Sequence, residues 1–264
     1  MFISLFKPQT TCLLATSWLL LHAIGAMAHS AAASSDTASQ LVQRAEQYRG
    51  LADSYVLNGR IETLQDGVQD KVQPYQLLAG TDRKSLVIFT GGINQGQKVL
   101  LQDQQFWLQL PGSRRPMRIT PMQKLMGEAS SGDVASLSWS QDYQATMVHD
   151  QADAAELVLE LTGNRAGLSY QRIRLVIADS DQFPLRAEFY VGSGKLAKQA
   201  TFVRGQLNGQ DRVIAMQLTD KLQSKAVTVL HYDSVTPQQL PARLFNPQAL
   251  TTVQALSLTP TQGG

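Results

Sequence analysis

The most informative part of the sequence is residues 86–143, LVIFTGGINQGQKVLLQDQQFWLQLPGSRRPMRITPMQKLMGEASSGDVASLSWSQDY. Its first part holds three strand-like runs, and the third carries a tryptophan and leads into a Pro-Gly turn and an arginine cluster. Its last part, residues 121–142, is apolar but lacks the alternation of a strand. We interpret this part as a flap over a β-barrel, and such a flap favours a covered apolar cavity over a catalytic cleft.

Strand and turn signals dominate the rest of the chain. Apolar side chains alternate with others along residues 157–161, 173–177 and 185–191, while Asp66-Gly67 and Asn208-Gly209 are tight-turn signals. Because successive side chains of a strand point to opposite faces, this period predicts one face against an apolar interior and one mostly in water. We count roughly eleven or twelve strands, which predicts a mainly β, antiparallel barrel or curved sheet.

Helices are expected at two places. Leu41, Ala45 and Tyr48 recur at helical spacing, which predicts a helix from about residue 38 to residue 51 across one end of the barrel. Within the flap, Asp133 is suited to cap one short lid helix and a second is expected around residues 122–126. The proline-rich tail from residue 236 onward is expected to cross the surface, pinned by Leu244, Phe245 and Leu250.

The first 28 residues have the features of a secretory signal peptide. Lys7 precedes an apolar run over residues 11–24, and Ala26-Met27-Ala28 is a small-x-small cleavage site, so cleavage is expected after Ala28. The alternative is a membrane anchor, but the run of about 14 residues is shorter than the roughly 20 that span a bilayer. Residues 29–38 are then a flexible leader, and residues 39–264 form one domain.

Composition excludes several classes of function. The only cysteine lies in the signal peptide, so the mature chain forms no internal disulfide. The formal net charge is +2, and removing Lys7 leaves +1, which argues against a nucleic-acid partner. The sequence has no HExxH, G-x-S-x-G or P-loop motif and no close pair of histidines. We therefore expect no enzyme activity, no metal and no cofactor.

Several segments carry a family resemblance: FWLQLPGSRRPMRI (106–119), Gly132-Asp133, the W..DY of residues 139–143, FPLRAEFYVGSGKLAKQATF (183–202), MQLTDKLQSKAVTVLHYDSV (216–235) and LPARLFNPQAL (240–250). In this order and spacing they resemble the LolA-like family of outer-membrane lipoprotein-sorting proteins, over nearly all of residues 40–252. The resemblance implies a half-closed, strongly curved antiparallel β-sheet with helices as a lid over an apolar space that accepts acyl chains.

The resemblance also implies a role. A family member of this kind is a periplasmic carrier, without a chemical step, between an inner-membrane exporter and an outer-membrane acceptor. The arginine-rich loop and the length look closer to a branch thought to work with permeases of the resistance-nodulation-division class, so the cargo is either a lipoprotein or another lipid. Exposing acyl chains to water costs about 0.8 kcal/mol per CH₂, so such cargo needs a shielding carrier, which we expect to be monomeric.

Candidate site residues come from the flap and the strand before it. Methionine side chains adapt to variable chains, and the predicted lipid-binding set is Trp107, Met117, Met122, Leu125, Met126, Val134, Leu137 and Trp139. Trp107 lies on the opposite strand face from Phe106, Leu108 and Leu110, so only one of these two sets can touch cargo. The alternative for the whole set is ordinary core.

Three arginines follow the Trp-bearing strand. Arg114, Arg115 and Arg118 are predicted to contact a lipid headgroup or a partner protein, and the alternative is a solvated loop. Two other functions stay open. One is a periplasmic lipid- or lipoprotein-sensing regulatory domain that binds a membrane-spanning regulator, although such sensors usually append a second domain. The other is an enzyme acting on lipids or glycans, for which no nucleophile and base are visible.

Overall fold

The computed structural model describes residues 37–50, 54–102, 104–135, 138–148, 153–219 and 226–257. The predicted signal peptide, its cleavage after Ala28 and most of the predicted leader lie outside these residues, as does Leu137. No helix among the described residues is long and apolar enough to span a bilayer.

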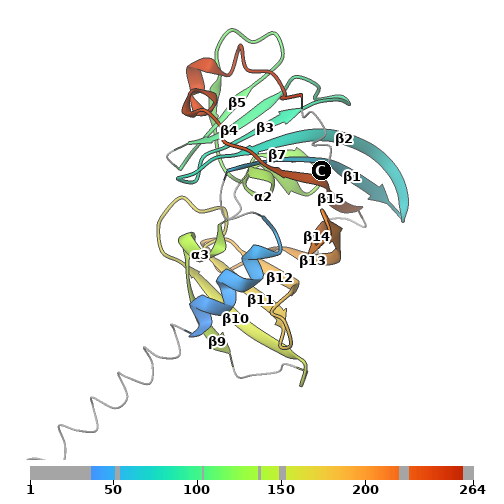
Figure 1. The fold of residues 1–264 in the computed structure, drawn as a ribbon, viewed down its shortest axis with the longest axis vertical. Helices are drawn as coiled ribbons and strands as arrows, with labels where there is room; N and C mark the ends of the chain where they lie inside the picture. The colour runs from blue at the N-terminus through green and yellow to red at the C-terminus, as the bar shows by residue number, and fades with distance from the viewer. Residues whose placement is uncertain are drawn as a thin grey trace, which may run out of the picture.

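One large antiparallel sheet organises the described residues (Figure 1). It contains thirteen strands in the order β6-β5-β4-β3-β2-β1-β15-β14-β13-β12-β11-β10-β9. The first meander comprises β1 (Tyr55–Gln65), β2 (Val68–Ala79), β3 (Ser85–Phe89), β4 (Lys98–Gln102), β5 (Gln105–Gln109) and β6 (Met117–Ile119). The second meander comprises β9 (Tyr143–Val148), β10 (Glu156–Gly163), β11 (Arg172–Ala178), β12 (Pro184–Tyr190), β13 (Leu196–Leu207), β14 (Gln210–Thr219) and β15 (Ala226–Pro237).

The two meanders meet where β1 pairs with β15, from Tyr55 opposite Pro237 to Gln65 opposite Ala226. The sheet ends at β6 and β9, which are not paired with each other, so it is half-closed as predicted. Register shifts leave one extra residue in each partner of β1: Asp233 in β15, opposite Asn58/Gly59, and Asp70 in β2, opposite Thr63/Leu64. Such bulges bend the strand that carries them and increase the local twist of the sheet. Gly59 fits only without a side chain, since an added Cβ would lie 2.3 Å from the carbonyl oxygen of His231.

The expected flap is an insert between the meanders, defined here as residues 120–142. It contains β7 (Lys124–Met126), β8 (Ala129–Ser130), α2 (Ser131–Ala135) and α3 (Trp139–Asp142). The prediction of a helix around residues 122–126 is therefore wrong, because Lys124–Met126 form β7, which pairs with β8 in a small hairpin. Asp133 lies inside α2, where its carboxylate accepts from the Ser130 backbone N–H at 2.8 Å, as the third residue of a capping box does.

A helix over residues 37–47 precedes the sheet, close to its predicted span. Ala38, Val42 and Ala45 on one side of it are buried in the main hydrophobic cluster, which we call the inner core. In Figure 1 this helix lies against β10–β12, while α2 and β7 lie against the first meander.

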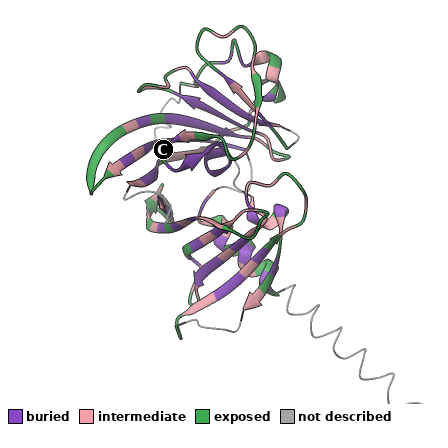
Figure 2. Ribbon diagram, turned by 180° about the vertical axis from the view of Figure 1, so that it is seen from behind, coloured by how far each residue is buried: buried purple, intermediate pink, exposed green. Residues whose placement is uncertain are grey.

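A second hydrophobic cluster, the outer core, lies on the opposite face of the first meander. There the tail, with η1 (Ala242–Phe245) and η2 (Pro247–Ala249), covers outward-facing side chains of β1 to β4. Phe245 and Leu250 are buried in it and Leu244 packs against it, so the predicted pinning of the tail is confirmed. Figure 2 shows the contrast between these buried strand centres and the exposed tip of the β1–β2 hairpin.

Candidate functional site

The inner face of the sheet is apolar across both meanders. Alternate residues of the strands supply this surface, among them Leu57, Tyr75, Leu77, Val87, Phe89, Leu159, Leu161, Ile173, Leu175, Phe189, Phe202 and Leu230. Two segments cover it, the helix over residues 37–47 and the insert. Both contribute side chains to the same inner core, so the candidate site is a covered apolar surface.

The hairpin of the insert rests on the line where the meanders join. Gly127 forms its turn with φ of 52°, and an added Cβ would lie 2.3 Å from Oγ1 of Thr228 on β15 and 2.7 Å from Cγ2 of Thr63 on β1. The Glu128 backbone N–H donates to the same Thr228 hydroxyl at 2.8 Å. This close approach fixes the position of the insert over β1 and β15.

A buried ion pair fastens the insert to the second meander. Lys198 on β13 and Asp133 on α2 are 4% and 7% exposed, and Nζ of Lys198 lies 2.7 Å from Oδ2 of Asp133. Nζ also donates to the carbonyl oxygen of Glu128 at 2.6 Å. Taking both charges out of water is costly, and good geometry with further hydrogen bonds is what offsets that cost.

The rest of this network is also hydrogen-bonded. Tyr170 donates its hydroxyl to Oδ1 of Asp133 at 2.7 Å, and the Ser130 hydroxyl donates to Oδ2 at 2.7 Å. Burial, followed by the neighbouring Asp133 carboxylate, raises the pKa of Tyr170 well above its ordinary value. The phenol therefore keeps its proton at neutral pH and remains a donor to Asp133.

A second polar contact couples the two covers to each other. The Glu46 carboxylate on the N-terminal helix accepts from the backbone N–H groups of Trp139 and Ser140 at the start of α3, and from the Ser140 hydroxyl. The Trp139 indole packs edge-on against Phe202 of β13, with ring centroids 5.7 Å apart. Movement of α3 would break these bonds, so the helix and the insert are mechanically linked.

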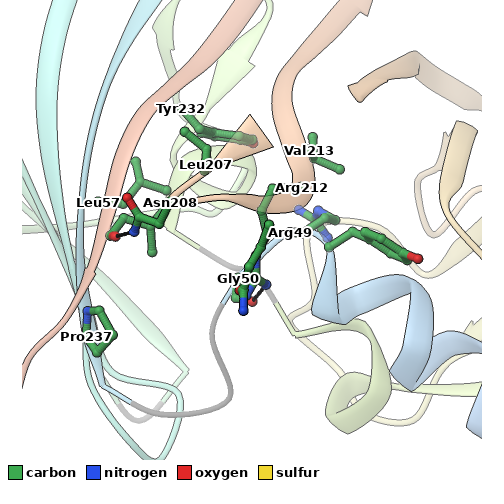
Figure 3. Close-up of a pocket in the computed structure, with 12 residues that line it drawn as sticks. Arg49, Gly50, Leu57, Leu207, Asn208, Arg212, Val213, Tyr232 and Pro237 are labelled. Atoms are coloured by element: carbon green, nitrogen blue, oxygen red, sulfur yellow. Dashed lines mark hydrogen bonds between the residues drawn. The ribbon is translucent and has the colours of Figure 1, made fainter. Parts of the chain in front are cut away.

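A cavity of about 240 Å³ opens where the N-terminal helix ends (Figure 3). Arg49 and Gly50 line it from the helix end, Leu57 and Tyr232 from β1 and β15, and Arg212 from β14. The remaining lining residues are Tyr48, Leu207, Asn208, Gln210, Val213, Val235 and Pro237. None of these described lining residues is an aspartate or glutamate, although two are arginines.

A larger depression of about 600 Å³ lies beside the loop that joins β2 and β3. Most of the residues that line it are polar, and three of its charged groups already pair with one another: Asp142 lies 3.1 Å from Nη1 of Arg83 and 3.0 Å from Nη2 of Arg165. It is therefore a weaker candidate for an apolar ligand than the inner face.

The predicted lipid-binding residues divide into two groups. Met126, Val134 and Trp139 are buried in the inner core, and Leu125 packs against it. Met117 and Met122 are 46% and 36% exposed instead. Because β5 directs Phe106 and Leu108 inward, Trp107 lies on the outer face, where it packs against the outer core.

The three predicted contact arginines are exposed. The guanidinium carbon of Arg118 lies 5.2 Å from the ring centroid of Trp107, so it stacks on the outer face of the sheet. Arg114 and Arg115 lie in the turn between β5 and β6. None of the three is among the residues that line the 240 Å³ cavity.

Sequence reasoning missed Arg49 and Lys198. Lys198 did leave a signal, because it occupies the same strand phase as Leu196, Ala200 and Phe202, where an apolar residue is expected. Arg49 left none, since an arginine near the end of a helix is ordinary. Its burial comes from the sheet that packs around it.

Comparison with known proteins supports the architecture. A family model described as "Uncharacterized protein" matches residues 81–252. No curated protein matches the chain significantly.

Solved structures are more informative. A LolA superfamily protein from Nitrosomonas europaea is 29% identical, with a TM-score of 0.72 over 79% of this chain and 97% of that chain. A putative outer membrane lipoprotein-sorting protein domain from Vibrio parahaemolyticus is 19% identical, with a TM-score of 0.65 over 82% and 99%. A DUF1329 family protein from Desulfovibrio piger is also 19% identical, with a TM-score of 0.66 over 82% and 99%. The predicted LolA-like fold is confirmed.

Proposed function

We propose that this protein is a periplasmic carrier of acyl chains. The chain belongs to the family whose model is described as "Uncharacterized protein", and it has the LolA-like fold. It binds a lipoprotein or another lipid on the inner face of its sheet. It receives this cargo from an inner-membrane exporter, for which a resistance-nodulation-division permease is the candidate, and delivers it toward an outer-membrane acceptor. The signal peptide is removed after Ala28, and residues 39–264 form the carrier domain.

The observation that carries this proposal is the covered inner face. Burying one CH₂ of a lipid tail stabilises the complex by about 0.8 kcal/mol relative to leaving it in water. A carrier therefore needs a continuous apolar surface. The inner core has such a surface on both meanders. In the closed state, Met126, Val134 and Trp139 of the insert occupy it, and an acyl chain would take their place.

The insert is suited to give way. Its elements span three, two, five and four residues, so it has little regular structure of its own. Polar groups at Asp133, Lys198 and Glu46 hold it in place, and these groups regain water when they are exposed. Opening therefore exchanges one set of hydrogen bonds for another while the apolar face becomes available to cargo.

The direct test is the lipid content of the native protein. The mature chain is purified from its own periplasm without detergent, extracted with organic solvent and analysed by mass spectrometry, with and without the candidate permease. We expect a stoichiometric lipid or acylated peptide, reduced when the exporter is deleted. An empty extract in both strains would contradict the carrier and favour a sensor whose ligand binds transiently.

A matched pair of variants connects the lipid to the inner face. Leu125→Glu places a charge where the insert meets the inner core, and we expect it to lower the lipid content sharply. Val68→Glu makes the same change at a residue that is 70% exposed at the tip of the β1–β2 hairpin, and lipid content should stay at the wild-type value. Circular dichroism checks that both variants fold. Equal lipid content in the two would place the cargo elsewhere.

A further inference from the structure

Arg49 is a buried cation that forms no ion pair with a carboxylate among the described residues. It is 7% exposed, and its Nε and Nη1 atoms have no hydrogen-bond partner among the described residues. Its guanidinium carbon lies 3.9 Å from the ring centroid of Trp139 and 5.8 Å from that of Phe202. Stacking on aromatic rings stabilises the charge, but it leaves the in-plane N–H groups free to donate.

The carboxylate one helical turn before Arg49 is already engaged. It belongs to Glu46 and accepts three hydrogen bonds from the start of α3. Arg212, the second arginine of the cavity, donates to the carbonyl oxygens of Gln47 and Gly50. These carbonyls are neutral, so neither guanidinium of the cavity is paired with a carboxylate among the described residues. The cavity therefore carries a net positive charge.

The remaining wall adds one polar group and an apolar surface. Burial raises the pKa of the Tyr232 hydroxyl, against the opposing effect of Arg49, so the phenol is protonated and can donate. Leu57, Leu207 and Val213 supply apolar surface around it. At about 240 Å³ the cavity is smaller than typical small-molecule pockets of roughly 300–1,000 Å³, so it fits the end of a ligand.

We propose that this cavity binds the anionic end group, a carboxylate or a phosphate, of an acyl lipid, and that Arg49 is its principal ligand-binding residue. Arg49 has donors without partners at Nε and at Nη1, and each can give one charge-assisted hydrogen bond to an oxygen of such a group, which is among the stronger bonds that an arginine makes. These two donors lie on opposite edges of the guanidinium, so they serve as separate donors and not as one bidentate fork. The lipid tail would continue from the cavity onto the inner face, which Arg49 adjoins through Trp139. The inference rests on the proposed function and adds to it a preference for charged lipids.

The test compares lipids that share a chain and differ at the end group. Binding of palmitate, hexadecyl phosphate, hexadecanol and inorganic phosphate to the full mature protein is measured by calorimetry. We expect at least one of the two anionic lipids to bind roughly tenfold or more tightly than hexadecanol, since hydrogen bonds to charged groups are the stronger ones. Whether palmitate or hexadecyl phosphate binds more tightly identifies the end group.

Variants assign the preference to Arg49. Arg49→Met keeps an apolar side chain against Trp139 and should remove the preference for anionic lipids while leaving hexadecanol binding in place; Arg49→Lys should retain part of it. Arg172→Met is the matched control, because Arg172 also stacks on a ring, 3.5 Å from the centroid of Tyr190, but on the outer face. Carbon-13 NMR of carboxyl-labelled palmitate gives an independent measure: the bound carboxyl should titrate at lower pH in the wild type than in Arg49→Met.

The outcomes separate this inference from the proposed function. If hexadecanol and both anionic lipids bind equally, or if Arg49→Met changes all three alike, the anionic subsite is overturned and the carrier remains. If inorganic phosphate binds as tightly as hexadecyl phosphate, the cavity is an ion site and not a lipid site. If none of the lipids binds the wild type, the carrier itself fails, and the subsite fails with it.

Discussion

The two meanders share one inner face but differ on the outside. On the first, Val56, Leu78 and Leu86 point outward into the outer core beneath the tail. On the second, the outer face is charged: Arg172 pairs with Glu160 at 2.8 Å, and Arg186 pairs with Glu156 at 2.6 Å. The first meander thus has a cover on each face, whereas charged side chains of the second meet water on its outer face.

The difference is visible in the strands themselves. In β3 every residue from Ser85 to Phe89 is buried, and β4 is buried from Lys98 to Leu101, because both faces are covered. In β10 from Leu159 to Thr162, and in β12 from Arg186 to Tyr190, buried positions alternate with partly or fully exposed ones. A strand's pattern therefore reports how many of its faces are covered, and the outer face of the second meander is a solvated surface.

The largest effect should come from the ion pair that joins the insert to the second meander. Lys198→Met leaves the Asp133 carboxylate buried without its cation, and we expect a loss of about 3–5 kcal/mol in the free energy of unfolding. Adding Asp133→Asn should recover part of the loss, since the amide oxygen still accepts from Tyr170, whereas the amide nitrogen cannot accept from the Ser130 backbone N–H. Urea denaturation at pH 7 measures both variants. If the free energy of unfolding of Lys198→Met alone lies within 1 kcal/mol of the wild-type value, the insert is held by apolar contacts alone.

The tail that covers the outer face of the first meander should contribute almost as much to the free energy of unfolding. Phe245→Ala removes the aromatic ring that the tail inserts into the outer core, and we expect a loss of about 3 kcal/mol in the free energy of unfolding. Arg174→Ala, on the outer face of β11, is the matched change on the second meander and should stay within about 0.5 kcal/mol of wild type. Similar losses in the two variants, measured by urea denaturation, would remove the contrast between the outer faces.

One substitution at the contact between the end of the N-terminal helix and the insert should stabilise the protein. Arg49→Met removes a buried charge whose Nε and Nη1 lack partners among the described residues, and we expect the ligand-free protein to gain about 1–2 kcal/mol. The melting temperature of delipidated protein is the measurement. A comparable loss would mean that stacking on Trp139 outweighs the cost of burying the charge.

The smallest effect belongs to the exposed pairs of the second meander. The hydrogen bond from Arg186 holds the pKa of Glu156 below its ordinary 4.5, so the pair contributes stability above that pH and loses it as the pH falls through the lowered pKa. Glu156→Gln should cost only about 0.3 kcal/mol at pH 7, because Arg186 is half exposed and solvent screens the pair. Denaturation at pH 7 and pH 3 should show the difference vanish at the lower pH.

Sequence patterns predicted the architecture better than the site. The alternation of β10 to β12, the position of the insert, the N-terminal helix and the pinned tail all follow from local patterns. The face of Trp107 does not, because inward and outward phases of β5 look alike when the tail covers the outside. The pairing of Lys198 with Asp133 joins residues 65 positions apart, and the isolation of Arg49 depends on what surrounds it, so neither leaves a local pattern.

The pairing of β1 with β15 has a consequence for how the chain folds. Each meander can grow by adding neighbouring hairpins, but this pairing brings together residues as distant as Arg60 and Asp233, 173 positions apart. Closing so long a loop is entropically costly and slow, so it is expected late in folding. Thr63 and Thr228, on which the insert rests, become neighbours only in that step. The insert therefore seats after the sheet is complete, and a half-folded chain has no closed compartment in which to confine a lipid.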